Sequence, residues 1–298
     1  MWVFLGIVSA FFLGFYDLLK KSALENNLVM PVLFLSSLTS AMIFLPLIII
    51  SSGAGPEQSE ALWYVHPVSG YEHLLIFLKS ILVGTSWVLS YFALRHLPIT
   101  IVTPIRASSP LWTLVGALII FGERLTLLQW LGITITIVSY YLFSLAGQKE
   151  GINFQKNKWV LFIFLATITG AGSGLYDKFL INNIERMSVQ AWFSIYLIPV
   201  LLVPAVIVWY QNRNKNIPFF WKPAIPLIGI TLTLSDYSYF YALSFDDSLI
   251  SILAVLRRSS VVIAFTAGAF LFREINLTRK SLVLVGILLG VLLIIMGS

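Results

Sequence analysis

Residues 14–17 read Gly-Phe-Tyr-Asp, and residues 174–177 read Gly-Leu-Tyr-Asp, 160 positions later. Each quartet lies near the end of a long apolar segment. Two further pairs recur in the same order at an offset of 151, namely Ala-Ser-Ser at 107–109 with Arg-Ser-Ser at 258–260, and Phe-Gly-Glu at 121–123 with Phe-Arg-Glu at 272–274. Three matches in one order indicate an internal duplication. The chain is therefore predicted to consist of two related halves.

The composition indicates which solvent surrounds these halves. Hydrophobic residues make up 58% of the 298 residues and charged residues 11%, and the mean hydropathy is +0.91. Soluble domains average roughly 45–50% apolar and about 25% charged residues. A water-soluble fold of this length could not bury so much apolar surface, so lipid is the expected solvent. Long unbroken apolar runs then favour membrane-spanning helices, which satisfy their own backbone amides.

Ten segments are long and apolar enough to be such helices, since crossing the bilayer takes roughly 20 residues. The expected spans are 2–19, 29–51, 73–94, 98–121, 126–146, 159–180, 189–210, 223–243, 248–272 and 280–296. They divide into a first five-helix repeat at 1–147, a connecting loop at 148–158 and a second repeat at 159–298. An odd number of spans in each half means that the second half enters the membrane in the opposite sense. The predicted fold is therefore all-α, with ten transmembrane helices as two inverted five-helix repeats, an arrangement typical of secondary transporters.

Residues 121–126 read Phe-Gly-Glu-Arg-Leu-Thr and have a weaker echo at 272–278. In the echo Arg273 replaces Gly122, and an Ile-Asn insertion delays the Leu-Thr pair. With the duplicated ten-span layout, these motifs make the whole chain resemble the EamA-domain proteins of the drug/metabolite transporter superfamily. The resemblance implies the fold and the transporter class, and hardly anything about the substrate. Glu123 and Glu274 look like part of a family turn motif, in which they would pair with Arg124 or Arg273.

The basic residues favour one orientation in the membrane. Loops after odd-numbered spans hold twelve Lys and Arg residues, and those after even-numbered spans, with their flanks, hold four, counting Lys79 among the flanks. By the positive-inside rule the odd loops are cytoplasmic and both termini are outside. The family resemblance implies the reverse, with both termini in the cytoplasm. The sequence leaves these two orientations open.

Ionisable residues inside the spans are the candidates for function, because charge is costly at mid-bilayer. Arg106 and Arg257 lie near the midplane, at equivalent places in the two repeats, where they could bind a carboxylate or phosphate of a substrate. Asp236 lies midway along the eighth span and could neutralise an amino group. Asp17 and Asp177, near span ends, are candidates for a coupling ion. The alternative is that these charges, with Arg258, pair with one another and fasten helices together.

Aromatic residues near these charges could line a central cavity and stack on an organic substrate. The candidates are Trp87, Tyr91, Trp112, Tyr237 and Tyr241. Each of them could equally be a packing residue.

Other functions lack their sequence signals. The chain has no cysteine, no cluster with metal-ligand spacing, no nucleotide-binding loop and no nucleophile elbow. We therefore expect no cofactor, no metal and no enzymatic activity. The net charge of +6 is scattered over short loops, which is typical of membrane orientation rather than nucleic-acid binding.

The sequence thus predicts a secondary transporter for a small polar or anionic organic metabolite, with amino acids as the leading class. Its expected partners are the lipid bilayer, the substrate and a coupling proton or other ion, and its expected location is the plasma (inner) membrane of a bacterium. The rival hypothesis is a membrane enzyme or accessory protein that acts on a lipid-linked substrate. The oligomeric state cannot be read from the residues.

Overall fold

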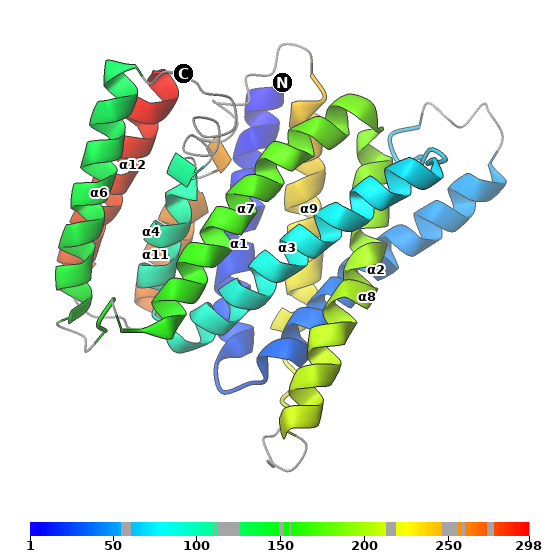
Figure 1. Cartoon of the computed structure of the whole chain (residues 1–298). Coiled ribbons are helices and arrows are strands. Elements are labelled where there is room, and N and C mark those ends of the chain that lie inside the picture. The colour runs from blue at the N-terminus through cyan, green and yellow to red at the C-terminus, as the bar shows by residue number, and fades with distance from the viewer. Residues whose placement is uncertain are drawn as a thin grey trace.

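A computed structural model describes residues 1–54, 61–109, 111–112, 126–148, 152–154, 156–212, 219–245, 256–257, 260–272 and 277–297. Within these ranges every regular element is an α-helix (Figure 1). The helices are α1 Trp2–Leu24, α2 Val29–Gly53, α3 Gly70–His96, α4 Ile99–Ala107, α6 Leu127–Gln148, α7 Lys158–Asn183, α8 Arg186–Asn212, α9 Ala224–Leu243, α11 Ser260–Leu271 and α12 Leu277–Met296.

Each helix falls on one expected span. Most of the remainder of the 98–121 and 248–272 spans lies outside the described residues. The same holds for Arg258 and for the turn-motif residues Glu123, Arg124, Arg273 and Glu274.

The first helix is longer than expected. It ends at Leu24 rather than at residue 19. The reason is that Lys20 and Lys21, which were expected in a loop, have hydrogen-bond partners inside the bundle. Lys20 is buried beside Asp17, and Lys21 Nζ donates to the carbonyl oxygens of Leu94 and Leu97 at 2.9 and 2.8 Å. Asp17 therefore lies in the interior of α1 and not near its end.

The most extensive packing joins helices from different halves of the chain. The pairs are α1 with α9, α6 with α12, α3 with α7 and α2 with α8, followed by α3 with α8, α2 with α9, α1 with α11 and α4 with α11. Helices α1 and α7 run in opposite directions, and so do α6 and α12 (Figure 1). Both termini lie at the same end of the bundle. The core between the helices is apolar, and Leu33, Leu94 and Ile163 are buried in it.

Five helices are long and apolar enough to cross a membrane, namely α1, α2, α3, α7 and α8. Leu127–Ser139 and Ser260–Leu271 are shorter apolar stretches. Many large apolar side chains point outward, among them Phe4 at 67% exposure and Phe270 at 80%. Such a surface is unfavourable in water and favourable in lipid.

Three of the counted lysines are not loop charges. Lys20, Lys79 and Lys280 lie inside α1, α3 and α12 and are buried. Lys20 and Lys280 were counted with the odd-numbered loops and Lys79 with the even-numbered ones, so the bias toward the odd-numbered loops persists.

A labelling experiment tests the orientation that this bias predicts. The chain has no native cysteine, so single cysteines can be introduced directly. The α6–α7 and α2–α3 connections lie at opposite ends of the bundle (Figure 1). We expect Lys156→Cys, in the first, to react with an impermeant maleimide only from the cytoplasmic side, and Leu62→Cys, in the second, only from the outside. The reverse pattern would contradict the charge rule and support the orientation implied by the family.

Candidate functional site

Asp17 is the centre of a buried charge cluster in the first half. Its Oδ1 accepts hydrogen bonds from Lys20 Nζ and from Arg106 Nη1, both at 2.8 Å. Lys20 lies one turn further along α1, and Arg106 lies in the last turn of α4. The Lys20 side chain is 1% exposed and the Asp17 side chain 9%. One buried carboxylate therefore holds two cations and joins α1 to α4.

Two tyrosine rings complete the surroundings of Lys20. Its Nζ lies 4.4 Å from the centroid of the Tyr16 ring and 5.2 Å from that of Tyr91. Both rings are buried, and an ammonium over an aromatic face is attracted by the ring quadrupole. Tyr91, predicted to line a substrate cavity, here packs against a lysine.

A buried ion pair joins the two halves through Asp177. Lys79 Nζ, from α3, lies 2.6 Å from Oδ1 of Asp177 on α7. The ammonium also lies 4.7 Å from the Phe193 ring and 4.5 Å from the Phe240 ring. The Lys79 side chain is 2% exposed, so water screens this pair little. The pair connects α3 to α7, which also pack extensively together.

Asp236 and Arg257 form the other ion pair of the second half. Arg257 Nη2 donates to Asp236 Oδ1, and the guanidinium lies 4.1 Å from the Tyr239 ring. The side chains are 15% and 20% exposed, respectively. Asp236 lies on α9, which is also the helix of Tyr239. The pair therefore ties the short helical turn at 256–257 to α9.

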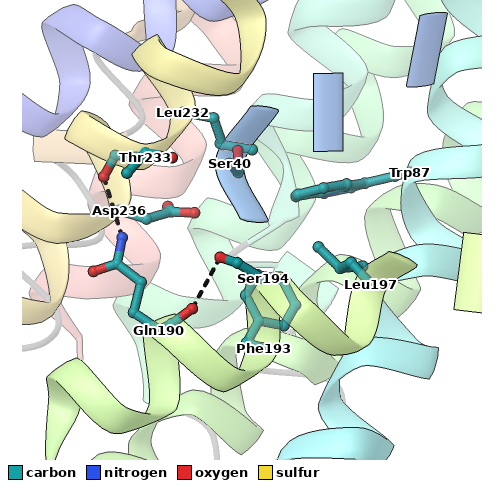
Figure 2. A pocket seen from close by; sticks show the side chains of 9 residues that line it. All are labelled: Ser40, Trp87, Gln190, Phe193, Ser194, Leu197, Leu232, Thr233 and Asp236. Carbon is teal, nitrogen blue, oxygen red and sulfur yellow. Dashed lines mark hydrogen bonds between the residues drawn. The ribbon is translucent and has the colours of Figure 1, made fainter. Parts of the chain in front are cut away.

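A small hollow lies beside Asp236 (Figure 2). The space among its lining side chains is about 240 Å³. Helices of both halves supply the lining, which consists of Ser40 from α2, Trp87 from α3, Gln190, Phe193, Ser194 and Leu197 from α8, and Leu232, Thr233 and Asp236 from α9. The hollow therefore lies at the junction of the two halves, where a relative movement would change its shape.

The polar groups of the hollow are mostly hydrogen-bond acceptors. Ser40 Oγ donates to the carbonyl of Gly229 at 3.1 Å, and Ser194 Oγ donates to the carbonyl of Gln190 at 2.9 Å. Both hydroxyls thus use their hydrogens on the backbone and keep lone pairs. Thr233 Oγ1 is buried and has no hydrogen-bond partner. Asp236 uses Oδ1 for Arg257, and no hydrogen bond to its Oδ2 occurs within the described part of the chain.

Of the predicted site residues, Trp87 and Asp236 line this hollow. Arg106 and Arg257, expected to face one central cavity, do not, because Asp17 on α1 and Asp236 on α9 each hold one of them. The paired-charge alternative therefore describes the resting geometry of these groups. Their contact with a substrate stays a prediction.

The other predicted aromatic residues also lie away from the hollow. Tyr237 packs against the apolar cluster that contains Phe44 and Met187. The guanidinium carbon of Arg186 lies 4.1 Å from the centroid of the Tyr241 ring. Trp112 is partly buried, and its Nε1 has no hydrogen-bond partner. These contacts are compatible with packing roles, and contact of these residues with a substrate stays a prediction.

Sequence reasoning missed Lys79 and the polar residues that face Asp236. Lys79 falls inside the expected 73–94 span and could have been found there, but it was assigned to a loop flank. Gln190, Ser194 and Thr233 carry no charge and so produce no comparable signal. Among the described residues, no group of three or more His, Asp or Glu side chains could hold a metal ion.

A helical bundle with an outward apolar surface is typical of a multi-pass membrane protein. Residues 1–145 match the family model described as the EamA-like transporter family. This first part of the chain therefore resembles the EamA domain of the drug/metabolite transporter superfamily, whose members are membrane transporters.

Two further comparisons concern the chain as a whole. No curated protein matches the sequence. A solved crystal structure is similar over 98% of this chain and 95% of its own, with 13% identity and a TM-score of 0.59. At this identity the similarity shows the fold alone.

Proposed function

We propose that the protein is a secondary transporter that moves a small polar or anionic organic metabolite, with amino acids as the leading class, by alternating access between two inverted five-helix repeats. The observation that carries the proposal is the packing of the halves. Each main helix pair takes one helix from each half, and α1 and α7, like α6 and α12, run in opposite directions (Figure 1). Two similar halves of opposite orientation can exchange conformations and open a central site to alternate sides.

The hollow beside Asp236 is the proposed substrate site. Both halves line it, so rocking of one half against the other would open it toward one side and close it toward the other. The hollow is narrow, which favours a small substrate.

We further propose that all ten described helices belong to spans, that the membrane is the bacterial plasma membrane, and that an ion gradient drives uptake or export. Asp17 and Asp177 are the proposed coupling groups, because each is a buried carboxylate that holds a lysine. Proton or ion binding to such a group would weaken its ion pair and release the helices that it joins.

Flux in liposomes tests the proposal. The purified protein is reconstituted, and radiolabelled amino acids and organic anions are screened for uptake and counterflow with and without a pH gradient. Arg257→Gln should reduce the initial rate at least about tenfold, the factor that corresponds to 1.4 kcal/mol, because it removes the cation that pairs with Asp236.

Arg106→Gln is the matched variant. It leaves Lys20 on Asp17, so a loss of flux with the fold intact would support contact of Arg106 with the substrate, and full flux would argue against that contact. Both variants are compared with wild type for folding by size-exclusion chromatography. Full flux in Arg257→Gln would place the site elsewhere, and absence of counterflow for every compound would argue against the transporter proposal.

A further inference from the structure

The hydrogen-bonding groups of the hollow favour a ligand that donates. Asp236 Oδ2 and the oxygens of Ser40, Ser194 and Thr233 lie around one small space (Figure 2). The two serine hydroxyls already donate to backbone carbonyls, so they can only accept from a ligand. Among the described residues that line the space there is no Lys or Arg. The Gln190 amide and the Thr233 hydroxyl can donate, but the Asp236 carboxylate would repel a bare anion, whereas it would attract an ammonium that the other oxygens also accept from.

The hollow also has an apolar side. Trp87, Phe193, Leu197 and Leu232 form it, and the Trp87 and Phe193 rings meet edge to face with centroids 6.1 Å apart. An indole face attracts a cation by its quadrupole, and the aliphatic residues suit a short apolar side chain. The ligand is therefore small and amphipathic, with its ammonium at the Asp236 end.

Charge balance indicates that the ligand carries a carboxylate beside its ammonium. Lys79, Asp177, Asp236 and Arg257 form two ion pairs with no net charge. A ligand with a net positive charge would add an uncompensated charge to a poorly solvated region, at a high free-energy cost. A zwitterion adds none, because its own carboxylate accompanies the ammonium. The Arg257 guanidinium, which donates to the other oxygen of Asp236, is the cation available for that carboxylate.

We propose that the substrate is a zwitterionic amine-carboxylate with a small apolar side chain, and that its ammonium binds Asp236 Oδ2 and Thr233 Oγ1 beside Trp87. The proposal rests on the transport function proposed above and names its substrate class. Thr233 Oγ1, buried without a partner, gains its missing hydrogen bond from the ligand. An unsatisfied buried hydroxyl destabilises a fold, so a hydrogen bond between the ligand and this hydroxyl would favour binding.

The test is a calorimetric titration of the purified protein with three matched probes: leucine, 3-methylbutylamine, which lacks the carboxylate, and 4-methylpentanoate, which lacks the ammonium. Valine and phenylalanine extend the zwitterion series. We expect at least one zwitterion to bind and both truncated probes to bind at least tenfold more weakly. Equal binding of the amine would overturn the zwitterion, and stronger binding of the carboxylate would overturn the ammonium site. Failure of all three zwitterions would overturn the substrate class.

Thr233→Val separates a binding role from a structural one. Valine has the shape of threonine without the hydroxyl, so the variant should keep or raise the thermal midpoint, yet bind the zwitterion about five- to tenfold more weakly. Thr231→Val is the control on the same helix, because Thr231 Oγ1 donates to the carbonyl of Leu227 on an exposed face and does not line the hollow. Unchanged affinity in Thr233→Val would refute its role.

These results are distinguishable from failure of the transport function. If liposomes show counterflow of an organic anion or an amine while no zwitterion binds or moves, the transporter stands and the substrate class is wrong. If a zwitterion binds with the predicted selectivity but shows no flux, the site stands and the transport proposal is wrong.

Discussion

Replacing Lys79 by methionine should destabilise the protein by about 3–5 kcal/mol, the usual cost of removing one partner of a buried ion pair. The lysine is 2% exposed and lies 2.6 Å from the Asp177 carboxylate. Methionine fills a similar volume, so the loss comes from the charge left on Asp177 and not from a cavity. Because the pair joins α3 to α7, the variant should also weaken the contact between the two halves.

The measurement is the midpoint of thermal aggregation in detergent, followed by size-exclusion chromatography. The matched variant is Lys79→Met with Asp177→Leu, which removes both charges. It should recover most of the lost stability, since a well-packed apolar pair often replaces a buried ion pair at little cost. An equally unstable double variant would show that packing of the lysine stem, and not charge, holds this contact.

The double variant also informs the coupling proposal. If it is stable and transports, but its flux no longer depends on the pH gradient, Asp177 carries the coupling ion. If the dependence persists, the coupling group is elsewhere, and Asp17 is the remaining candidate. This second readout separates a structural ion pair from a functional one.

The helices could be predicted from the sequence because their signal is local. Each span is a long apolar run, and each described helix falls on one of these runs. The end of the first helix could not be predicted, because it depends on residues far along the chain. Lys21 Nζ donates hydrogen bonds to the carbonyl oxygens of Leu94 and Leu97.

The helical placement of the charged residues could be predicted, and their partners could not. Arg106 lies on α4, as its place in the apolar run predicts. Its bond to Asp17, 89 positions away, depends on how α1 and α4 pack. A candidate site built from equivalent positions therefore contained two arginines that the fold directs to two different acids.

The glycines show the same limit at atomic scale. Gly14 and Gly174 are equivalent in the repeated quartets. A Cβ at Gly14 would lie 2.8 Å from Cβ of Ile263, whereas a Cβ at Gly174 would have no neighbour within 4 Å. Identical residues at identical repeat positions thus have different roles, because different helices face them.

A larger steric effect is expected at Gly229, where α9 approaches α2. A Cβ there would lie 2.4 Å from the backbone oxygen of Ser36 and 2.8 Å from Cβ of Thr39. Backbone cannot rotate away as a side chain can, so Gly229→Ala must push the two helices apart. Overpacking of this kind costs about 1–3 kcal/mol or more. The carbonyl of Gly229 also accepts the hydrogen bond from Ser40, which lines the hollow, so zwitterion binding should be lost together with stability.

Gly174→Ala is the matched control for this prediction. It makes the same substitution inside α7, where the added methyl group meets open space. Because alanine favours the helix over glycine by about 0.5–1 kcal/mol, this variant should be as stable as wild type or more stable, with unchanged affinity. The thermal midpoint and the calorimetric affinity of both variants are measured side by side. A Gly229→Ala variant that matches wild type in both would mean that α2 and α9 are further apart than the structure has them, and the hollow between them would then have a different lining.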